Sequence, residues 1–294
     1  MRWCTSRFDV DLSTPRIMGI VNVTPDSFSD GGRHASTRDA LQHCELLLSE
    51  GAHMLDIGGE STRPGSPAVA LEDELARVLP VVQGAVRLGV PVSVDTYKPE
   101  VMRAVLDAGA DIINDIWALR QGDALQAVAA HPRCGVCLMH MHRDPQTMQV
   151  QPMEGDVVPD VLAFLQQRSQ ALQALAVASD RIVLDPGVGF GKTVAQNFSL
   201  LSRQSDLLAL GFPLLAGWSR KSSLGAVTGQ ALPAERVAAS VAAALLAVER
   251  GARVVRVHDV RQTSDALRVW QAGRLEYLAT STHLFTDGHS LRQP

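Results

Sequence analysis

The stretch GAHMLDIGG, residues 51–59, links the end of one expected helix to one short expected strand. A glycine just past a helix end supplies the left-handed residue that terminates the helix, and the short apolar run after it is typical of a buried strand. The same Gly-Ala pair stands before an apolar run at Gly109–Ala110 and at Gly251–Ala252. The repetition therefore indicates equivalent helix-to-strand joints in one repeating architecture.

Short apolar runs of this kind recur eight times, at residues 16–23, 52–59, 90–96, 111–116, 134–141, 180–187, 212–219 and 253–260. Between them lie longer stretches with apolar residues at helical spacing, such as residues 71–89 and 235–251. Strands that alternate with helices favour a parallel sheet. Dividing 294 residues by eight gives about 37 per unit, a suitable length for a strand-helix repeat. We predict an α/β protein built as a single (β/α)8 TIM barrel, with a doubly wound open sheet as the alternative because strand number does not prove closure.

The domain organisation follows from the same series. No linker rich in proline, glycine or serine interrupts it. We therefore expect one domain over residues 1–294, with the barrel core at about residues 15–279 and a polar C-terminal tail at residues 280–294.

Composition narrows the class of function. The chain is 46% hydrophobic and 20% charged, which is the balance of a folded globular protein. Its net charge of -4 gives no basic field, so we expect small-molecule substrates and neither a nucleic-acid nor a membrane partner. No apolar run approaches the ~18 residues of a membrane span and no signal peptide is evident, which favours a cytoplasmic location.

The four cysteines are too few and too scattered for a disulfide framework, so we expect thiols. Cys134 and Cys137 form a CxxC pair that could belong to a metal or redox site. Residues three apart on a strand point to opposite faces, however, and this geometry argues against a shared role.

Polar residues end most of the predicted strands. A parallel barrel carries its active site at the carboxyl ends of the strands. Six of the eight runs end on polar side chains that a purely structural strand would avoid, namely Asn22, Asp56, Asp95, Asn114, Asp185 and the pair Arg256 and His258. Each one alone could be a cap or a surface ion pair, but all of them together indicate a functional site.

These residues divide by chemistry into two groups. Asp95, Asn114, Asp185 and Lys221 offer acceptors and donors suited to a flat heterocycle with an amidine-like edge. The second group resembles an anion site and comprises Asn22, Thr62, Arg63, Arg256 and His258. A site with both halves could bind a heterocycle that carries a diphosphate.

The stretch DPGVGFGK, residues 185–192, has the glycines of a phosphate-binding loop but completes neither the GxxxxGK[ST] nor the GxGxxG pattern. Nucleotide hydrolysis is therefore disfavoured. The glycines are more typical of a loop whose backbone approaches a ligand. His140 and His142 could be imagined as metal ligands, but no acidic partner is nearby, so strand-end histidines with ordinary hydrogen bonds are the favoured interpretation.

The motifs together resemble a known enzyme family. In chain order they are MGIVNVTPDSFSDGG, DIGGESTRPGS, SVDTYKPEV, INDI, LMHM, LDPGVGFGK, GWSRKSSLG and RVHDV. This series is similar to bacterial dihydropteroate synthases, the folate-pathway enzymes inhibited by sulfonamides, from about Pro15 to the final helix. The resemblance implies a homodimeric TIM barrel that condenses 6-hydroxymethyl-7,8-dihydropterin diphosphate with 4-aminobenzoate to give 7,8-dihydropteroate and pyrophosphate, with Mg²⁺ as cofactor.

The resemblance also implies roles for individual residues. Asp95, Asn114, Ile116, Met139, Asp185, Lys221 and Arg256 would bind the pterin, and Thr62, Arg63, Arg256 and His258 the diphosphate. Asn22 would be the metal ligand. The surroundings of 4-aminobenzoate would be Phe28, Thr62, Pro64, Phe190, Lys221 and Ser222. We expect Asn22, Arg63, Lys221, Arg256 and His258 to act in the chemical step, which we interpret as a dissociative displacement of diphosphate.

The segment NVTPDSFSDGG, residues 22–32, is too polar for the core. We interpret it as a loop that closes over the site, with Phe28 as a lid over the aminobenzoate ring. Two departures from the family pattern stand nearby in the predicted site: His142-Arg143 where Gln-Gly is common, and Val188 where Phe is frequent.

Two other functions remain open at this point. A pterin-dependent methyltransferase domain would share the barrel and the pterin-binding acids but would have no use for an anion site. A pterin-binding paralogue without catalysis would be expected to lose Arg63, Lys221 or Asn22, and all three are present.

Overall fold

The computed structural model describes residues 1–24, 32–63 and 65–286, and its centre is a closed parallel barrel. The barrel strands are β3 (Arg16–Asn22), β4 (Met54–Gly58), β5 (Val92–Asp95), β6 (Ile112–Asp115), β7 (Gly135–Met139), β8 (Ile182–Asp185), β9 (Leu214–Ala216) and β10 (Ala252–Val257). They pair in chain order, and β10 pairs with β3 to close the ring. Closure confirms the predicted TIM barrel and excludes the open doubly wound sheet.

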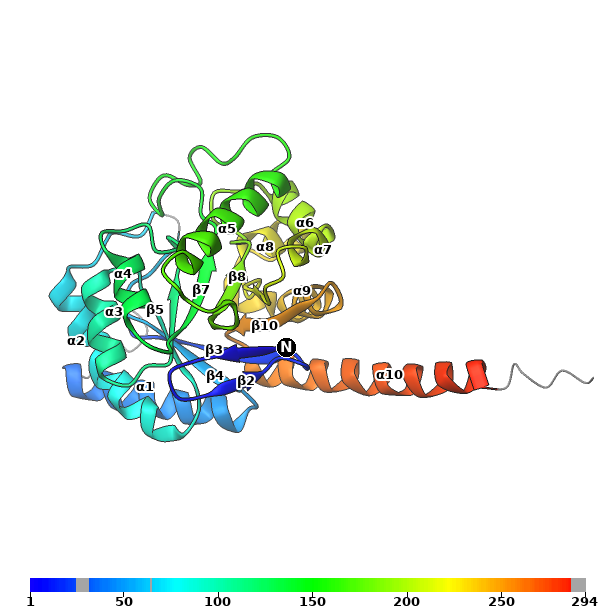
Figure 1. Ribbon diagram of the computed structural model, residues 1–294, viewed down its shortest axis with the longest axis horizontal. Coiled ribbons are helices and arrows are strands. Elements are labelled where there is room, and N and C mark those ends of the chain that lie inside the picture. Colours follow the sequence, from blue (N-terminus) through cyan, green and yellow to red (C-terminus); the bar gives the residue numbers. More distant parts are fainter. Residues whose placement is uncertain (25–31, 64, 287–294) are drawn as a thin grey trace, which may run out of the picture.

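Helices cover the outside of the barrel (Figure 1). They are α1 (Gly32–Ser49), α2 (Leu71–Ala85), α3 (Pro99–Asp107), α4 (Ala124–Ala130), α5 (Val158–Gln173), α6 (Val194–Ser202), α7 (Gln204–Leu208), α8 (Ser222–Thr228), α9 (Val237–Glu249) and α10 (Val260–Thr286). Apolar residues that point outward from the strands, such as Val94 and Val136, form one large core with the inner helix faces. Figure 1 shows that α10 extends well beyond the barrel; this helix reaches Thr286, so the expected tail begins inside it.

The three Gly-Ala joints have the backbone that the sequence predicts. Gly51, Gly109 and Gly251 have φ of 106°, 96° and 96°, in the region that favours glycine. A side chain at Gly51 or Gly251 would also meet a neighbour at 2.6 or 2.5 Å. These glycines therefore end their helices and let the chain turn directly into β4, β6 and β10.

An N-terminal hairpin closes one end of the barrel, a feature that the sequence analysis did not predict. Strands β1 (Arg2–Cys4) and β2 (Asp9–Asp11) pair antiparallel. Trp3 and Leu12 are fully buried, and the indole of Trp3 donates to the carbonyl of Arg181 at 3.0 Å. They pack against the apolar interior residues Met18, Met54, Ile112, Cys137, Val183, Leu215 and Val254. The hairpin and these residues together form an apolar plug inside the barrel.

The cysteines are free thiols, as expected. Cys137 belongs to the apolar plug, whereas Cys134 lies in the outer core, where Arg181 contacts its sulfur at 3.3 Å. The two sulfurs therefore occupy different sides of the sheet, as the strand geometry predicts.

Among the described helices, none is by itself long and apolar enough to cross a membrane. The bent pair Ser222–Thr228 and Pro233–Glu249 reaches that length and apolarity only when both parts are taken together.

Candidate active site

The polar residues of the barrel interior lie one layer above the apolar plug. Side chains two apart on a strand share a face, so Asp56 follows Met54, Asn114 follows Ile112, Asp185 follows Val183 and Arg256 follows Val254 into the same interior. Strand register adds Asp95, which is the Cα partner of Asn114. The strand ends that the sequence singled out are thus brought into one interior site, at the carboxyl end of the barrel.

Arg256 binds two of these residues directly, and a third is joined to it through Asp56. Its Nε donates to Asp56 Oδ2 at 2.5 Å and its NH2 group donates to Asp95 Oδ2 at 2.8 Å. Asn114 donates from Nδ2 to the same Asp56 oxygen at 3.1 Å. Bonds to charged groups in a buried place are strong and directional, so these contacts fix the position of the guanidinium.

Burial sets the charges of the site. It raises the pKa of Asp95 to about 7, although the Arg256 guanidinium opposes the change. Burial also raises the pKa of Asp185, against the hydrogen bond that its carboxylate accepts from Gly187 N. Burial acts to lower the pKa of Arg256, but the Asp56 and Asp95 carboxylates outweigh it and raise that pKa. The result is an arginine that stays charged between two acids.

Two buried oxygens below this cluster have no partner among the described residues: Asp56 Oδ1 and Ser93 Oγ. Asp56 and Ser93 are Cα partners on β4 and β5. An unpartnered buried acceptor is costly unless a polar hydrogen reaches it. The floor of the site is therefore suited to a polar ligand or to water, and less suited to an apolar group.

Lys221 and Phe190 form the next part of the site. The Lys221 ammonium lies 4.2 Å from the centroid of the Phe190 ring. Burial lowers the pKa of Lys221 to about 8, while Asp185 opposes that shift. Ile116, Met139 and Phe190 belong to one buried apolar cluster. This cluster supplies the apolar surroundings that the sequence predicted beside the polar set.

The expected anion residues lie at the carboxyl ends of β3 and β10 and in the loop after β4. His258 lies just after β10, and burial lowers its pKa to about 3, so the ring is neutral at pH 7. Ser219 Oγ accepts the backbone N–H of His258 at 3.1 Å and lies 2.9 Å from its Nδ1. The serine hydrogen can therefore go to Nδ1, which leaves the ring proton on Nε2 as a donor. Arg63 is close enough to lower the pKa values of both Lys221 and His258.

The remaining predicted site residues are described only by their place in the fold. Asn22 ends β3 and Thr62 lies in the loop after β4, both partly exposed. Ser222 begins α8, and Lys221 is the residue just before that helix. Phe28 and Pro64 lie outside the described residues, so their expected contacts with 4-aminobenzoate stay predictions.

A cluster around Lys98 was missed by the sequence analysis. Lys98 Nζ contacts carboxylate oxygens of Glu60 and, at 2.5 Å, of Glu74. Tyr97 Oη donates to Glu60 Oε1 at 2.9 Å, and Thr96 Oγ1 donates to Glu74 Oε1 at 2.6 Å. Because Glu60 is two residues before Thr62, the cluster ties the start of that loop to β5 and α2. The sequence signal that could have found this cluster is the scarcity of lysine. The whole chain has three lysines, namely Lys98, Lys192 and Lys221.

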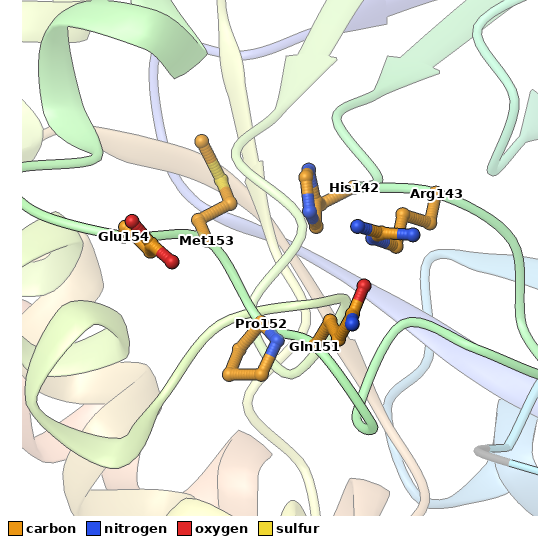
Figure 2. Close-up of a pocket in the computed structure, with 6 residues that line it drawn as sticks. All are labelled: His142, Arg143, Gln151, Pro152, Met153 and Glu154. Atoms are coloured by element: carbon orange, nitrogen blue, oxygen red, sulfur yellow. The ribbon is translucent and has the colours of Figure 1, made fainter.

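The loop between β7 and α5 contains the unusual His142-Arg143 pair. It surrounds a cavity of about 500 Å³ lined by His142, Arg143, Gln151, Pro152, Met153 and Glu154 (Figure 2). Two backbone bonds hold this loop to its neighbours: Gly65 N donates to Pro145 O at 3.1 Å, and Met153 N donates to Gly191 O at 2.9 Å. The loop therefore contacts both the Thr62 loop and the loop after β8.

Comparisons with known proteins agree with this geometry. The family model described as pterin binding enzyme matches residues 18–258. Dihydropteroate synthase of Neisseria meningitidis serogroup B is 51% identical over 275 residues, which cover 92% of this chain and 96% of that protein. The solved structure of Xanthomonas albilineans dihydropteroate synthase with 4-aminobenzoic acid has a TM-score of 0.85 and 53% identity over 90% of this chain and 95% of that one. The Burkholderia cenocepacia enzyme complexed with 7,8-dihydropteroate has a TM-score of 0.86 and 52% identity over 95% of this chain and 98% of that one.

Proposed function

The chain belongs to the pterin-binding enzyme family, and from this premise we propose that it is a dihydropteroate synthase. It condenses 6-hydroxymethyl-7,8-dihydropterin diphosphate with 4-aminobenzoate and forms 7,8-dihydropteroate and pyrophosphate. The observation that carries this function is the buried cluster in which Arg256 bridges Asp56 and Asp95 beside Asn114. A pterin has an amino-amide edge whose donors and acceptors match carboxylates and an amide in a dry interior.

The leaving diphosphate is the centre of the proposed mechanism. An aromatic amine is a weak nucleophile, so the C–O bond to diphosphate breaks ahead of attack and the electron-rich pterin delocalises the positive methylene. Arg63, Arg256 and the Nε2 hydrogen of neutral His258 donate to the charge that grows on the diphosphate oxygens. Thr62 adds a hydroxyl on the same side. Loss of one such donor costs about 3 to 4 kcal/mol of transition-state stabilisation, roughly 10² to 10³ in rate.

The described residues fit a Mg²⁺ ion that takes few ligands from the protein. In the described part of the chain no three His, Cys, Asp or Glu side chains could together hold an ion. The Asn22 side chain stands at the end of β3 and is partly exposed. Mg²⁺ commonly takes one or two protein oxygens together with water and substrate phosphates. We therefore propose that Asn22 holds a Mg²⁺ ion brought with the diphosphate, where the ion supplies charge neutralisation for the leaving group.

The second substrate is bound beside Phe190. Its ring stacks near Phe190, and its carboxylate is met by Lys221 and Ser222. The amine is neutral at pH 7, so attack needs no general base and no covalent enzyme intermediate. After the new C–N bond has formed, the amine proton passes to water or to the released pyrophosphate.

One assay separates this function from the two alternatives. Pyrophosphate is measured with the pterin diphosphate and Mg²⁺, with and without 4-aminobenzoate, for the wild type and for Asp185→Asn. A synthase releases pyrophosphate that depends on 4-aminobenzoate, and Asp185→Asn reduces the release through weaker pterin binding. A methyltransferase domain or a non-catalytic pterin-binding protein gives no aminobenzoate-dependent release.

We also propose a homodimer that forms through the surface of α8 and α9. This surface exposes the apolar residues Val227, Leu232 and Leu246, with exposed fractions of 59%, 61% and 44%. Leu246→Glu should convert a dimer to a monomer in light scattering, and an unchanged mass would exclude this surface. The four free thiols support a cytoplasmic location, which fractionation of the source cells would test.

A further inference from the structure

The three lysines of the chain share one location. The chain has 27 lysines and arginines, and all but Lys98, Lys192 and Lys221 are arginine. Lys98 follows β5, Lys192 follows β8 and Lys221 follows β9, so each lies at the carboxyl end of the barrel. Lysine presents a compact ammonium with three hydrogens, whereas arginine presents a wide planar fork. The loops after β5, β8 and β9 therefore each carry a compact ammonium at this end of the barrel.

Lys192 is buried beneath the loop that follows β8. The residue is only 2% exposed. Its Nζ donates to Gly187 O at 2.8 Å and to Phe190 O at 3.1 Å, and it lies 2.9 Å from His140 Nδ1. A longer contact of 3.4 Å reaches the carbonyl of His140. The ammonium thus joins the loop after β8 to the end of β7.

His140 is suited to accept this bond. Burial lowers its pKa to about 2, and Lys192 itself contributes to the lowering. The imidazole is therefore neutral, and its Nδ1 can accept a hydrogen from the ammonium. The ring also packs edge-on against Phe164, with 4.9 Å between the ring centroids. These contacts hold the His140 ring beside the Lys192 ammonium.

Other bonds also hold the loop after β8, such as Gly189 N to Asn197 Oδ1 at 2.9 Å, but Lys192 is the side chain that binds the carbonyls of both Gly187 and Phe190. Gly187, Gly189 and Gly191 all have positive φ, of 69°, 81° and 71°. A side chain at Gly187 would fall 1.8 Å from His140 O. Such a backbone is flexible unless its carbonyls are held. Phe190 lies within this loop and its ring faces Lys221, and the Phe190 carbonyl is one of the groups that Lys192 binds.

We propose that Lys192 and His140 form a positioning pair that fixes Phe190 and thereby shapes the aminobenzoate half of the site. The pair acts through the loop backbone and does not contact substrate. Asp185 lies on the strand β8 itself, and the Lys192 charge acts on its carboxyl without a hydrogen bond between them, so the pair affects pterin binding less than it affects the position of Phe190. This inference rests on the proposed function, because it assigns Phe190 to the second substrate.

The first test compares Lys192→Met, which keeps the unbranched stem but removes the ammonium, with Lys192→Arg, which keeps charge but not shape. Arg268→Met is the control, because it removes an exposed cation on α10. Both Lys192 variants should raise the KM for 4-aminobenzoate at least tenfold and leave the Kd for the pterin diphosphate within threefold. The control should leave both constants unchanged. A Lys192→Met enzyme with an unchanged aminobenzoate KM, or with equal losses in both constants, overturns the proposal.

The second test uses His140 and does not depend on the folding of a Lys192 variant. His140→Asn keeps an acceptor near the position of Nδ1, whereas His140→Leu removes it. The aminobenzoate KM should rise less than threefold in His140→Asn and at least tenfold in His140→Leu, and adding Lys192→Met to His140→Leu should raise it little further. Equal constants for the Asn and Leu variants would refute the pair. A wild type without aminobenzoate-dependent turnover would refute the proposed function instead.

Discussion

The NH2 group of Arg256 donates to Oδ2 of Asp95 across the barrel interior, at 2.8 Å. The same guanidinium is held by the fully buried Asp56. A pterin edge that binds Asp95 must therefore share that carboxylate with Arg256, or take the place of its NH2 group. In the second case Asp56 retains Arg256 through Nε, and the freed NH2 group can turn toward the diphosphate.

Pterin binding should depend on pH through Asp95. Burial raises the pKa of this carboxyl to about 7, so it loses its charge as the pH falls through 7. Only the carboxylate accepts from the pterin, so affinity for the pterin diphosphate should weaken as pH is lowered from 8 to 6, by up to tenfold per unit below the pKa. Calorimetric titration at each pH measures this. Asp95→Asn should bind weakly at every pH, and a variant that keeps the wild-type pH step would exclude Asp95 as its source.

Arg63→Met tests the leaving-group charge. The substitution removes a fork-shaped donor from the diphosphate side, so kcat should fall by about 10² to 10³, equivalent to about 3 to 4 kcal/mol. Arg63→Lys should recover only part of the loss, because one ammonium cannot bind two phosphate oxygens in the same plane. Steady-state kinetics with saturating 4-aminobenzoate checks this. A wild-type kcat for Arg63→Met would remove Arg63 from the chemical step.

Lys98→Met should loosen the loop that carries Thr62 and Arg63. The ammonium ties Glu60 of this loop to the buried Glu74 of α2, and its loss leaves two acids facing each other. The KM for the pterin diphosphate should rise and kcat should fall, each by about tenfold. Arg103→Met is the matched control, since it breaks an exposed ion pair with Asp123. If both variants behave alike, the loop does not depend on Lys98.

Because the chain has three lysines, the charge of each lysine side chain can be measured separately. Protein labelled with ¹³C and ¹⁵N in lysine should give three side-chain signals, which the Lys→Met variants assign. Burial lowers the pKa of Lys192 to about 7 and that of Lys221 to about 8, whereas Glu60 and Glu74 outweigh burial and raise the pKa of Lys98. The signals should therefore titrate in the order Lys192, Lys221, Lys98 as pH rises. Three titrations together near the usual value of about 10.4 would contradict these environments.

The barrel was predictable because each of its units repeats the same local pattern. Apolar runs, helical spacing and the glycines of the three Gly-Ala joints are local signals, but strand number does not prove closure, which the pairing of β10 with β3 establishes. The N-terminal hairpin was not predictable in this way. Its strands have three residues each, and the burial of Trp3 depends on a contact with Arg181, far along the chain.

The site was predictable only in part. Strand-end polarity identified Asp95, Asn114, Asp185 and Arg256, because parallel strands bring their carboxyl ends together. The shared contact of Arg256 and Asn114 with Asp56 depends on register, which one sequence does not reveal. The role of Lys192 was missed because its ammonium binds backbone carbonyl groups. Every residue has such a carbonyl, so the sequence does not show which of them lie near Lys192.

The most direct test of the central claim is a balance of products. Purified protein with Mg²⁺, the pterin diphosphate and 4-aminobenzoate is sampled over time, with 7,8-dihydropteroate measured by mass spectrometry and pyrophosphate by an enzymatic assay. A dihydropteroate synthase forms the two products in a one-to-one ratio, and forms neither when 4-aminobenzoate is omitted. Pterin consumption without dihydropteroate, or no consumption at all, would contradict the account.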